Sequence, residues 1–160
     1  MNYNKTGKRI IVPLAIAACL SAGLTGCGKK STEEHLEAAK QFANANNSDA
    51  AIIEFKNAIK SNPKAPEPRF ELGKYYLQTG DFDGAEKELN RALDLGQSAS
   101  EVIPYLSVAY QKTGAENALA GVDFQMEGMT AVESAEVGFY KMQAMAQLGK
   151  NEDALALIDQ

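Results

Sequence analysis

The chain contains few of the residues from which metal and catalytic sites are built. It has one histidine, His35, and two cysteines, Cys19 and Cys27, among 160 residues. A lone histidine without cysteines at ligand spacing does not supply the ligands of a metal site. We therefore expect that the protein is not an enzyme and uses no cofactor or metal. His35 itself is expected to be structural or solvated.

The chain also lacks a surplus of basic residues. It has 16 Lys and Arg against 21 Asp and Glu, a net charge of -5, and no run of basic residues. Nucleic-acid binding depends on clustered lysine and arginine that neutralise phosphates, so no nucleic-acid partner is expected. The glycines do not have the spacing of a phosphate-binding loop, and no small-molecule substrate is expected.

No apolar run is long enough for a typical transmembrane helix, which needs about 20 residues. The apolar segment at 10–23 is short, contains Pro13, follows three basic residues and precedes small residues. This layout is typical of a secretory signal peptide, which we assign to residues 1–26. Because that segment carries three basic and no acidic residues, its removal changes the net charge from -5 to -8. Cys27 is then left without a partner, so no internal disulfide is expected.

The sequence Leu24-Thr25-Gly26-Cys27 resembles the lipobox of bacterial lipoproteins. The resemblance implies that Cys27 is the lipid attachment site and carries acyl chains that anchor the protein in a membrane. Two or three chains make the anchor stable, since each buried methylene contributes about 0.8 kcal/mol. The alternative is an ordinary signal peptide followed by an incidental cysteine.

The residues after Cys27 bear on the location of the protein. Gly28 stands where an aspartate would retain such a lipoprotein in the inner membrane. The resemblance therefore implies the outer membrane of a Gram-negative bacterium, facing the periplasm. Residues 27–31 form only a short linker, so Lys29 and Lys30 are expected near anionic lipid head groups.

Beyond residue 31 the sequence repeats itself with a period of 34 residues. Five positions that recur are Ala39, Phe42, Ala51, Phe55 and Ala58, which correspond to Gly73, Tyr76, Ala85, Leu89 and Ala92. The spacing within each set is helical, and the helices come in pairs.

The stretch "LGKYYLQTGDFDGAEKELNRALDL" resembles the tetratricopeptide (TPR) repeat, in which two antiparallel helices form each unit. The resemblance implies an all-α fold, a right-handed α-solenoid of helix-turn-helix repeats. Small residues allow the two helices of a unit to approach, and we expect Gly73 and Ala85 to face each other.

The predicted array covers residues 32–160 in four units. These are 32–65, 66–99, a degenerate unit at 100–133 and an incomplete one at 134–160. Ser31 and Glu34 have the spacing of a capping box at the first helix. In the third unit we expect a sound first helix at 100–113 and an irregular second helix at about 116–126, because Leu119 and Asp123 depart from the repeat pattern.

The apolar residues Leu155, Leu157 and Ile158 have no following repeat to cover them. A terminal repeat normally has a polar outer face, because each unit buries its apolar side only against a neighbour. The chain is therefore expected to be truncated, a fragment of a longer array, or a subunit whose end packs on a partner. Truncation is the preferred interpretation.

The first helices of such repeats line a concave groove, which suits an extended peptide or a helix of a partner protein. The repeat alignment places eleven residues in this partner-binding groove: Leu36, Glu37, Lys40, Asn44, Phe70, Glu71, Lys74, Gln78, Tyr105, Val108 and Lys112. The set mixes apolar and charged side chains. It does not reproduce the lysine and asparagine pattern of repeats that clamp a C-terminal carboxylate.

Four features stand in a recognisable order along the chain: the lipobox, "AIIEFKNAIKSNP", "PRFELGKYYLQTGDFDGAEKELNRALDLG" and "SEVIPYLSVAYQKTG". Together they resemble the amino-terminal part of the TPR lipoprotein associated with PEP-CTERM and exosortase systems. That resemblance implies a non-catalytic envelope scaffold linked to exopolysaccharide production and protein sorting. The alternative is a pilotin-like or outer-membrane assembly lipoprotein for pilus, secretin or barrel biogenesis. A third hypothesis places a catalytic domain in a missing C-terminal part.

Overall fold

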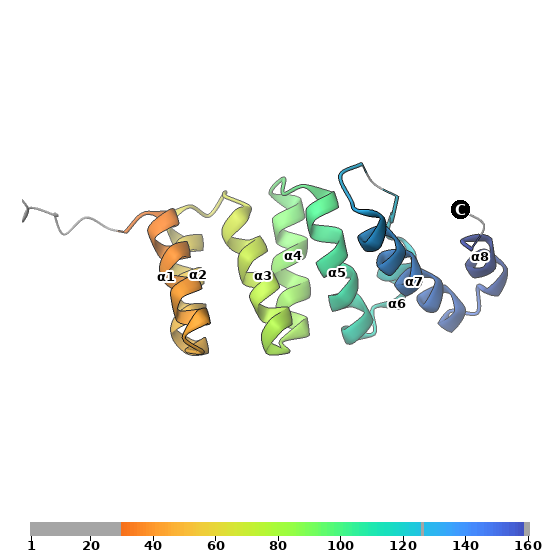
Figure 1. The fold of residues 1–160 in the computed structure, drawn as a ribbon, viewed down its shortest axis with the longest axis horizontal. Coiled ribbons are helices and arrows are strands. Elements are labelled where there is room, and N and C mark those ends of the chain that lie inside the picture. Colours follow the sequence, from red (N-terminus) through yellow and green to blue (C-terminus); the bar gives the residue numbers. More distant parts are fainter. Residues whose placement is uncertain (1–29, 126, 159–160) are drawn as a thin grey trace, which may run out of the picture.

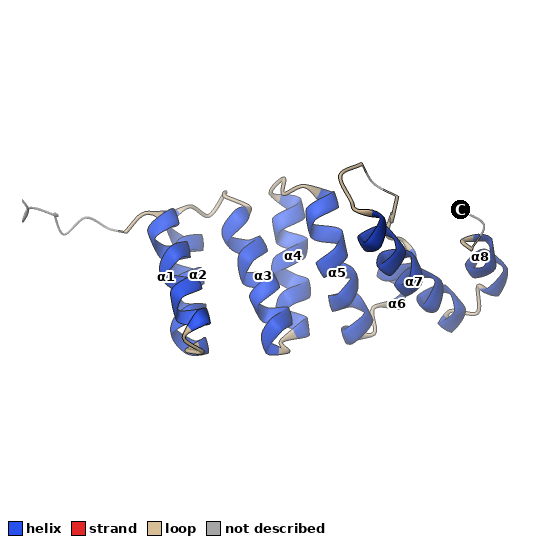
Figure 2. Cartoon of the chain, in the orientation of Figure 1, coloured by secondary structure: helices blue, strands red, loops and turns tan. Residues whose placement is uncertain are grey.

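The computed structural model describes residues 30–125 and 127–158. The predicted signal peptide and the predicted lipid attachment site, Cys27, lie outside these residues. The described part contains helices and loops without strands (Figure 2). The helices are α1 (Thr32–Asn44), α2 (Ser48–Ser61), α3 (Glu67–Thr79), α4 (Phe82–Asp94), α5 (Ala99–Thr113), α6 (Glu116–Ala120), α7 (Ala131–Gln147) and α8 (Asn151–Ala156).

The helices are stacked in pairs along one axis, which confirms the all-α repeat fold. Within the pairs, α1 packs on α2 and α3 on α4, and successive pairs are joined by contacts such as α2 with α3 and α4 with α5. Figure 1 shows α1, α3, α5 and α7 in sequence along the row, with α2 and α4 behind them. The first helices of the pairs therefore share one face of the array.

Small residues lie where the paired helices meet, as the repeat pattern predicts. Ala39, Ala51, Ala85 and Ala92 are fully buried. Gly73 and Ala85 are both buried, and the side chain closest to Gly73 is Leu89. A Cβ atom built on Gly73 would lie 2.7 Å from Leu89 Cγ and 3.3 Å from Leu89 N, so the close approach is to the residue one turn later in α4.

The turns within the helix pairs use residues that tolerate the left-handed region. Asn46, Gly80, Gly114 and Gly149 have φ values of 56°, 83°, 75° and 76°. Glycine and asparagine reach this region at low cost, and it lets the chain leave one helix and enter the next. Each of the four pairs thus reverses at an equivalent residue.

The predicted capping box at the start of the array is confirmed. The Ser31 Oγ accepts a hydrogen bond from the Glu34 amide at 3.1 Å, and the Ser31 amide donates to Glu34 Oε2 at 2.7 Å. Two amides at the helix N-terminus are thereby satisfied.

The third unit differs from the expected boundaries. Its second helix, α6, ends at Ala120, well before residue 126, and α7 begins at Ala131 instead of near 134. The early start has a local cause, since Thr130 and Glu133 form a second capping box. The loop between α6 and α7, visible in Figure 2, replaces the rest of the expected helix.

This loop contacts α7 through Val122 and Phe124. The Lys141 Nζ donates a hydrogen bond to the Val122 carbonyl at 2.7 Å. The ring of Phe124 lies against Gly138, where an added Cβ would be 3.0 Å from the ring. Val122 is itself buried. The loop therefore packs on the array in place of a helix.

Candidate functional site: the face of the first helices

The face shared by α1, α3, α5 and α7, which we call the first-helix face, contains most of the predicted groove residues. Nine of the eleven are half-buried or exposed: Glu37, Lys40, Asn44, Glu71, Lys74, Gln78, Tyr105, Val108 and Lys112. Polar and charged groups from three successive helices are therefore available on this face. Such a surface suits contact with another protein more than burial in a core.

Two predicted groove residues, Leu36 and Phe70, are wrong as exposed contact residues. Leu36 is 5% exposed and Phe70 is 8% exposed. The Phe70 ring is covered by Tyr105 of the next first helix, with ring centroids 5.6 Å apart in an edge-to-face arrangement. Both residues belong to the packed core. An alignment of repeats identifies the inward position but does not show which neighbour covers it.

A cleft of about 310 Å³ separates α1 from α3 on this face. It brings together five of the predicted residues: Lys40, Asn44, Glu71, Lys74 and Gln78. Ammonium, carboxylate and amide groups thus line one cleft. These groups can donate hydrogen bonds to peptide carbonyls, accept from peptide amides and pair with charged side chains.

Three further residues line the same cleft and were not predicted as groove residues: Ala43, Phe55 and Tyr75. The Tyr75 ring lies 5.6 Å from the Phe55 ring, and its hydroxyl donates to Ser48 Oγ at 3.0 Å. Phe55 is one of the recurring positions of the repeat. Phe55 lines the cleft because of the distance between two neighbouring units. The sequence contains no signal from which that distance could be predicted.

Lys74 is held at the junction of α3 and α5. Its Nζ lies 5.0 Å from the centre of the Phe70 ring and 5.6 Å from that of Tyr105. It also donates to Glu71 Oε1 at 3.2 Å. Cation–π attraction and the ion pair together restrict this lysine, which reduces the entropy lost when a partner binds. Tyr105 remains 39% exposed beside it.

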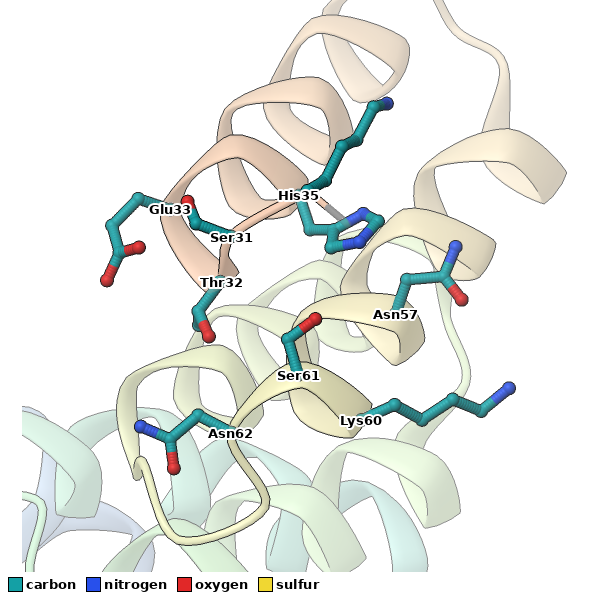
Figure 3. Close-up of a pocket in the computed structure, with 9 residues that line it drawn as sticks. Ser31, Thr32, Glu33, His35, Asn57, Lys60, Ser61 and Asn62 are labelled. Carbon is teal, nitrogen blue, oxygen red and sulfur yellow. The ribbon is translucent and has the colours of Figure 1, made fainter. Parts of the chain in front are cut away.

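A second hollow, of about 600 Å³, lies in the first helix pair, between the start of α1 and the end of α2. Figure 3 shows the Glu33 and Lys60 side chains extending in opposite directions around it. His35 lies at its edge, and its Nδ1 is 2.6 Å from Glu54 Oε2. The histidine is therefore engaged in a contact between α1 and α2, and the charged groups do not converge on a ligand.

Among residues 30–125 and 127–158 there is no group of three or more His, Cys, Asp or Glu side chains that could hold a metal ion. Within the same residues, no helix has the length and apolar character needed to cross a bilayer.

Comparison with known proteins agrees with the repeat architecture. Residues 36–100 match the model of the tetratricopeptide repeat family, and the described helix pairs are stacked as in a TPR solenoid. Domains of this class are typically non-catalytic scaffolds that bind other proteins. No curated protein sequence matches the chain significantly.

The fold is similar to two crystal structures of the TPR protein MamA. One has a TM-score of 0.57, and the match covers 80% of this chain and 74% of that one at 17% sequence identity. The other has a TM-score of 0.59, covering 80% of this chain and 69% of that one, again at 17% identity. At this identity the similarity concerns the fold alone.

Proposed function

We propose that the protein is a lipid-anchored scaffold of the bacterial cell envelope that holds a segment of a partner protein on its first-helix face. The observation that carries the proposal is the cleft between α1 and α3, where Lys40, Asn44, Glu71, Lys74 and Gln78 lie together. Beside it, the Phe70–Lys74–Tyr105 contact offers a partly exposed aromatic surface. A mixed polar and aromatic surface of this kind is typical of protein recognition.

The anchor part of the proposal rests on the sequence "LTGCGKK" at residues 24–30. Cys27 would carry the acyl chains at the outer membrane, on the periplasmic side. Since α1 begins at Thr32, the array would stand close to the bilayer. Metabolic labelling with a fatty-acid analogue tests this point. Label should enter the wild-type protein and be absent from the Cys27→Ala variant, and equal labelling of both would contradict the anchor.

The cellular role that we propose is support of exopolysaccharide production and of PEP-CTERM/exosortase protein sorting. It is supported by the sequence resemblance of residues 24–114, which joins the lipobox to the first repeats. Crosslinking in native membranes, followed by purification and mass spectrometry, should recover components of polysaccharide export or sorting. Recovery of secretin or barrel-assembly components instead would replace this role with the alternative one. Recovery of neither would contradict both.

A further inference from the structure

The cleft between α1 and α3 has an apolar floor. Phe55 and Tyr75 line it and are only 2% and 7% exposed. Their ring centroids lie 5.6 Å apart, and the Tyr75 hydroxyl is already engaged, since it donates a hydrogen bond to Ser48 Oγ. Ala43 adds a half-buried methyl group beside the rings. A side chain that reaches the floor therefore meets aromatic rings and a methyl group.

The mouth of the same cleft is polar. Lys40, Asn44 and Gln78 line it and are exposed. The other two charged groups of the cleft, Glu71 and Lys74, pair with each other at 3.2 Å. None of the ion pairs among the described residues involves Lys40. An ammonium group and two amide groups are thus available to a ligand that enters the cleft.

The charges of the cleft favour a ligand group that accepts hydrogen bonds. Two lysines, Lys40 and Lys74, stand against the single carboxylate of Glu71. A lysine ammonium has donors and no acceptor, so Lys40 needs an acceptor on the ligand. An arginine or lysine of a partner would bring a further cation to this mouth and be repelled.

The size of the cleft suits one large side chain. Its volume of about 310 Å³ lies at the lower end of the range of about 300–1,000 Å³ that is typical of ligand pockets. The side chain that matches both ends of the cleft has an apolar ring and a tip that accepts a hydrogen bond. Tyrosine has both, because its ring is apolar and its hydroxyl both accepts and donates.

Other side chains match only one end of the cleft. Phenylalanine has no polar tip, and the indole of tryptophan is a donor only, so neither accepts from Lys40. Aspartate and glutamate accept, but they leave the rings of Phe55 and Tyr75 uncovered. Histidine can accept through one ring nitrogen, but its polar ring loses hydration against an apolar floor.

We propose that the cleft between α1 and α3 binds the side chain of one tyrosine in the partner segment. The ring packs on Phe55 and Tyr75, as aromatic rings do at centroid distances of about 4.5–7 Å. The hydroxyl accepts from Lys40 and donates to the amide oxygen of Asn44 or Gln78. This inference rests on the proposed function of the first-helix face and specifies which residue the partner segment must contain.

Selection of peptides on the purified full-length protein tests the proposal. Random peptides displayed on phage are selected for binding, and we expect a tyrosine to be enriched in them. The affinities of a selected peptide and of its Tyr→Phe, Tyr→Trp and Tyr→Arg forms are then measured by fluorescence polarisation. The tyrosine form should bind about tenfold more tightly than the phenylalanine form, because a hydrogen bond to a charged group is lost.

Two lysine variants show whether this preference arises in the cleft. Lys40→Met keeps an apolar stem and removes the ammonium group, so the tyrosine and phenylalanine forms should bind it equally well. Lys56→Met is the matched control, because Lys56 is an exposed lysine of α2 that does not line the cleft. It should prefer the tyrosine form as strongly as the wild type does.

The possible failures of this inference and of the proposed function differ. Selected peptides without tyrosine, equal binding of the tyrosine and phenylalanine forms to the wild type, or a preference that persists in Lys40→Met would overturn the inference. The proposed function still stands if those peptides bind the Lys40→Ala, Tyr105→Ala double variant more weakly than the wild type. Peptides that bind this double variant as tightly as the wild type, or selection of no peptide at all, would argue against both.

Discussion

Gly73 lies where α3 packs closely on α4, and a larger side chain at this position would collide with Leu89. Replacing it with alanine would place a methyl group 2.7 Å from Leu89 Cγ, with the Leu89 backbone nitrogen at 3.3 Å. The better helix propensity of alanine offsets up to about 1 kcal/mol. Overpacking costs about 1–3 kcal/mol. We therefore expect Gly73→Ala to lower the free energy of unfolding.

Denaturant unfolding followed by circular dichroism measures the effect of Gly73→Ala. Gly121→Ala is the matched control, because its nearest contact would be 3.4 Å from the Ala118 carbonyl oxygen, an ordinary distance. Its unfolding free energy should change little. If Gly73→Ala were as stable as the wild type, the close packing of α3 on α4 would be refuted.

The carboxylate of Glu133 makes the stability of the start of α7 depend on pH. The Thr130 amide and hydroxyl donate to Glu133 Oε2 at 2.8 and 2.7 Å. These hydrogen bonds favour the ionised form and hold the pKa of Glu133 below its usual value of 4.5. A lowered folded-state pKa means that the stabilisation is fully present above pH 4.5 and is lost as the pH falls through the folded-state value.

The prediction concerns the difference between wild type and Glu133→Gln. Thermal unfolding of the two proteins should differ most above pH 4.5, and the difference should shrink under more acidic conditions. The wild type should be the more stable protein in the upper range. A difference that stays constant across the acidic range would show that the ionised carboxylate does not stabilise the cap.

Among the structural elements, the loop after α6 is held against α7 by a hydrogen bond from Lys141. Replacing this lysine with methionine keeps an apolar stem but leaves the Val122 carbonyl without its 2.7 Å donor. An unsatisfied, partly buried carbonyl costs about 1–3 kcal/mol. We expect faster amide hydrogen exchange in residues 121–130 of Lys141→Met. Exchange in α1 to α4 should be unaffected, because those helices lie in other units.

Lys87→Met is the control for this experiment, because Lys87 is exposed on α4. It should leave the exchange rates of the loop unchanged. Equal loop exchange in Lys141→Met and wild type would indicate that Phe124 and Val122 alone fasten the loop.

The helix pairs were predictable because each is specified by local signals. The predicted capping box at Ser31 acts within a few residues of the chain, and the structure confirms it. The turns at Gly80 and Gly114 are equally local features. The third unit was harder to predict. Leu119 and Asp123 indicated an irregular second helix, but its end at Ala120 depends on contacts of the following loop with α7. Contacts between elements are not encoded in the periodicity of either one.

In the whole molecule, the candidate binding surface also depends partly on local sequence and partly on contacts between repeat units. Nine of the eleven predicted groove residues are half-buried or exposed, and their part in partner binding stays a prediction. Leu36 and Phe70 were misplaced because their exposure depends on the next unit in the stack.

We propose that the first-helix face holds a partner protein. The most direct test compares partner recovery by two double variants after crosslinking in native membranes. Lys40→Ala with Tyr105→Ala removes an exposed lysine and a 39% exposed aromatic from this face. Lys56→Ala with Ile53→Ala removes an exposed lysine and a 58% exposed apolar residue from α2. Both proteins are first shown to unfold at the wild-type temperature.

We expect the Lys40 and Tyr105 double variant to lose most of the partner, by about tenfold or more. A loss of about 1.4 kcal/mol of binding free energy from the two truncations together weakens binding tenfold. The Lys56 and Ile53 double variant should recover as much partner as the wild type. Undiminished recovery by the first variant, or an equal loss in both, would contradict the claim that the first-helix face is the binding surface.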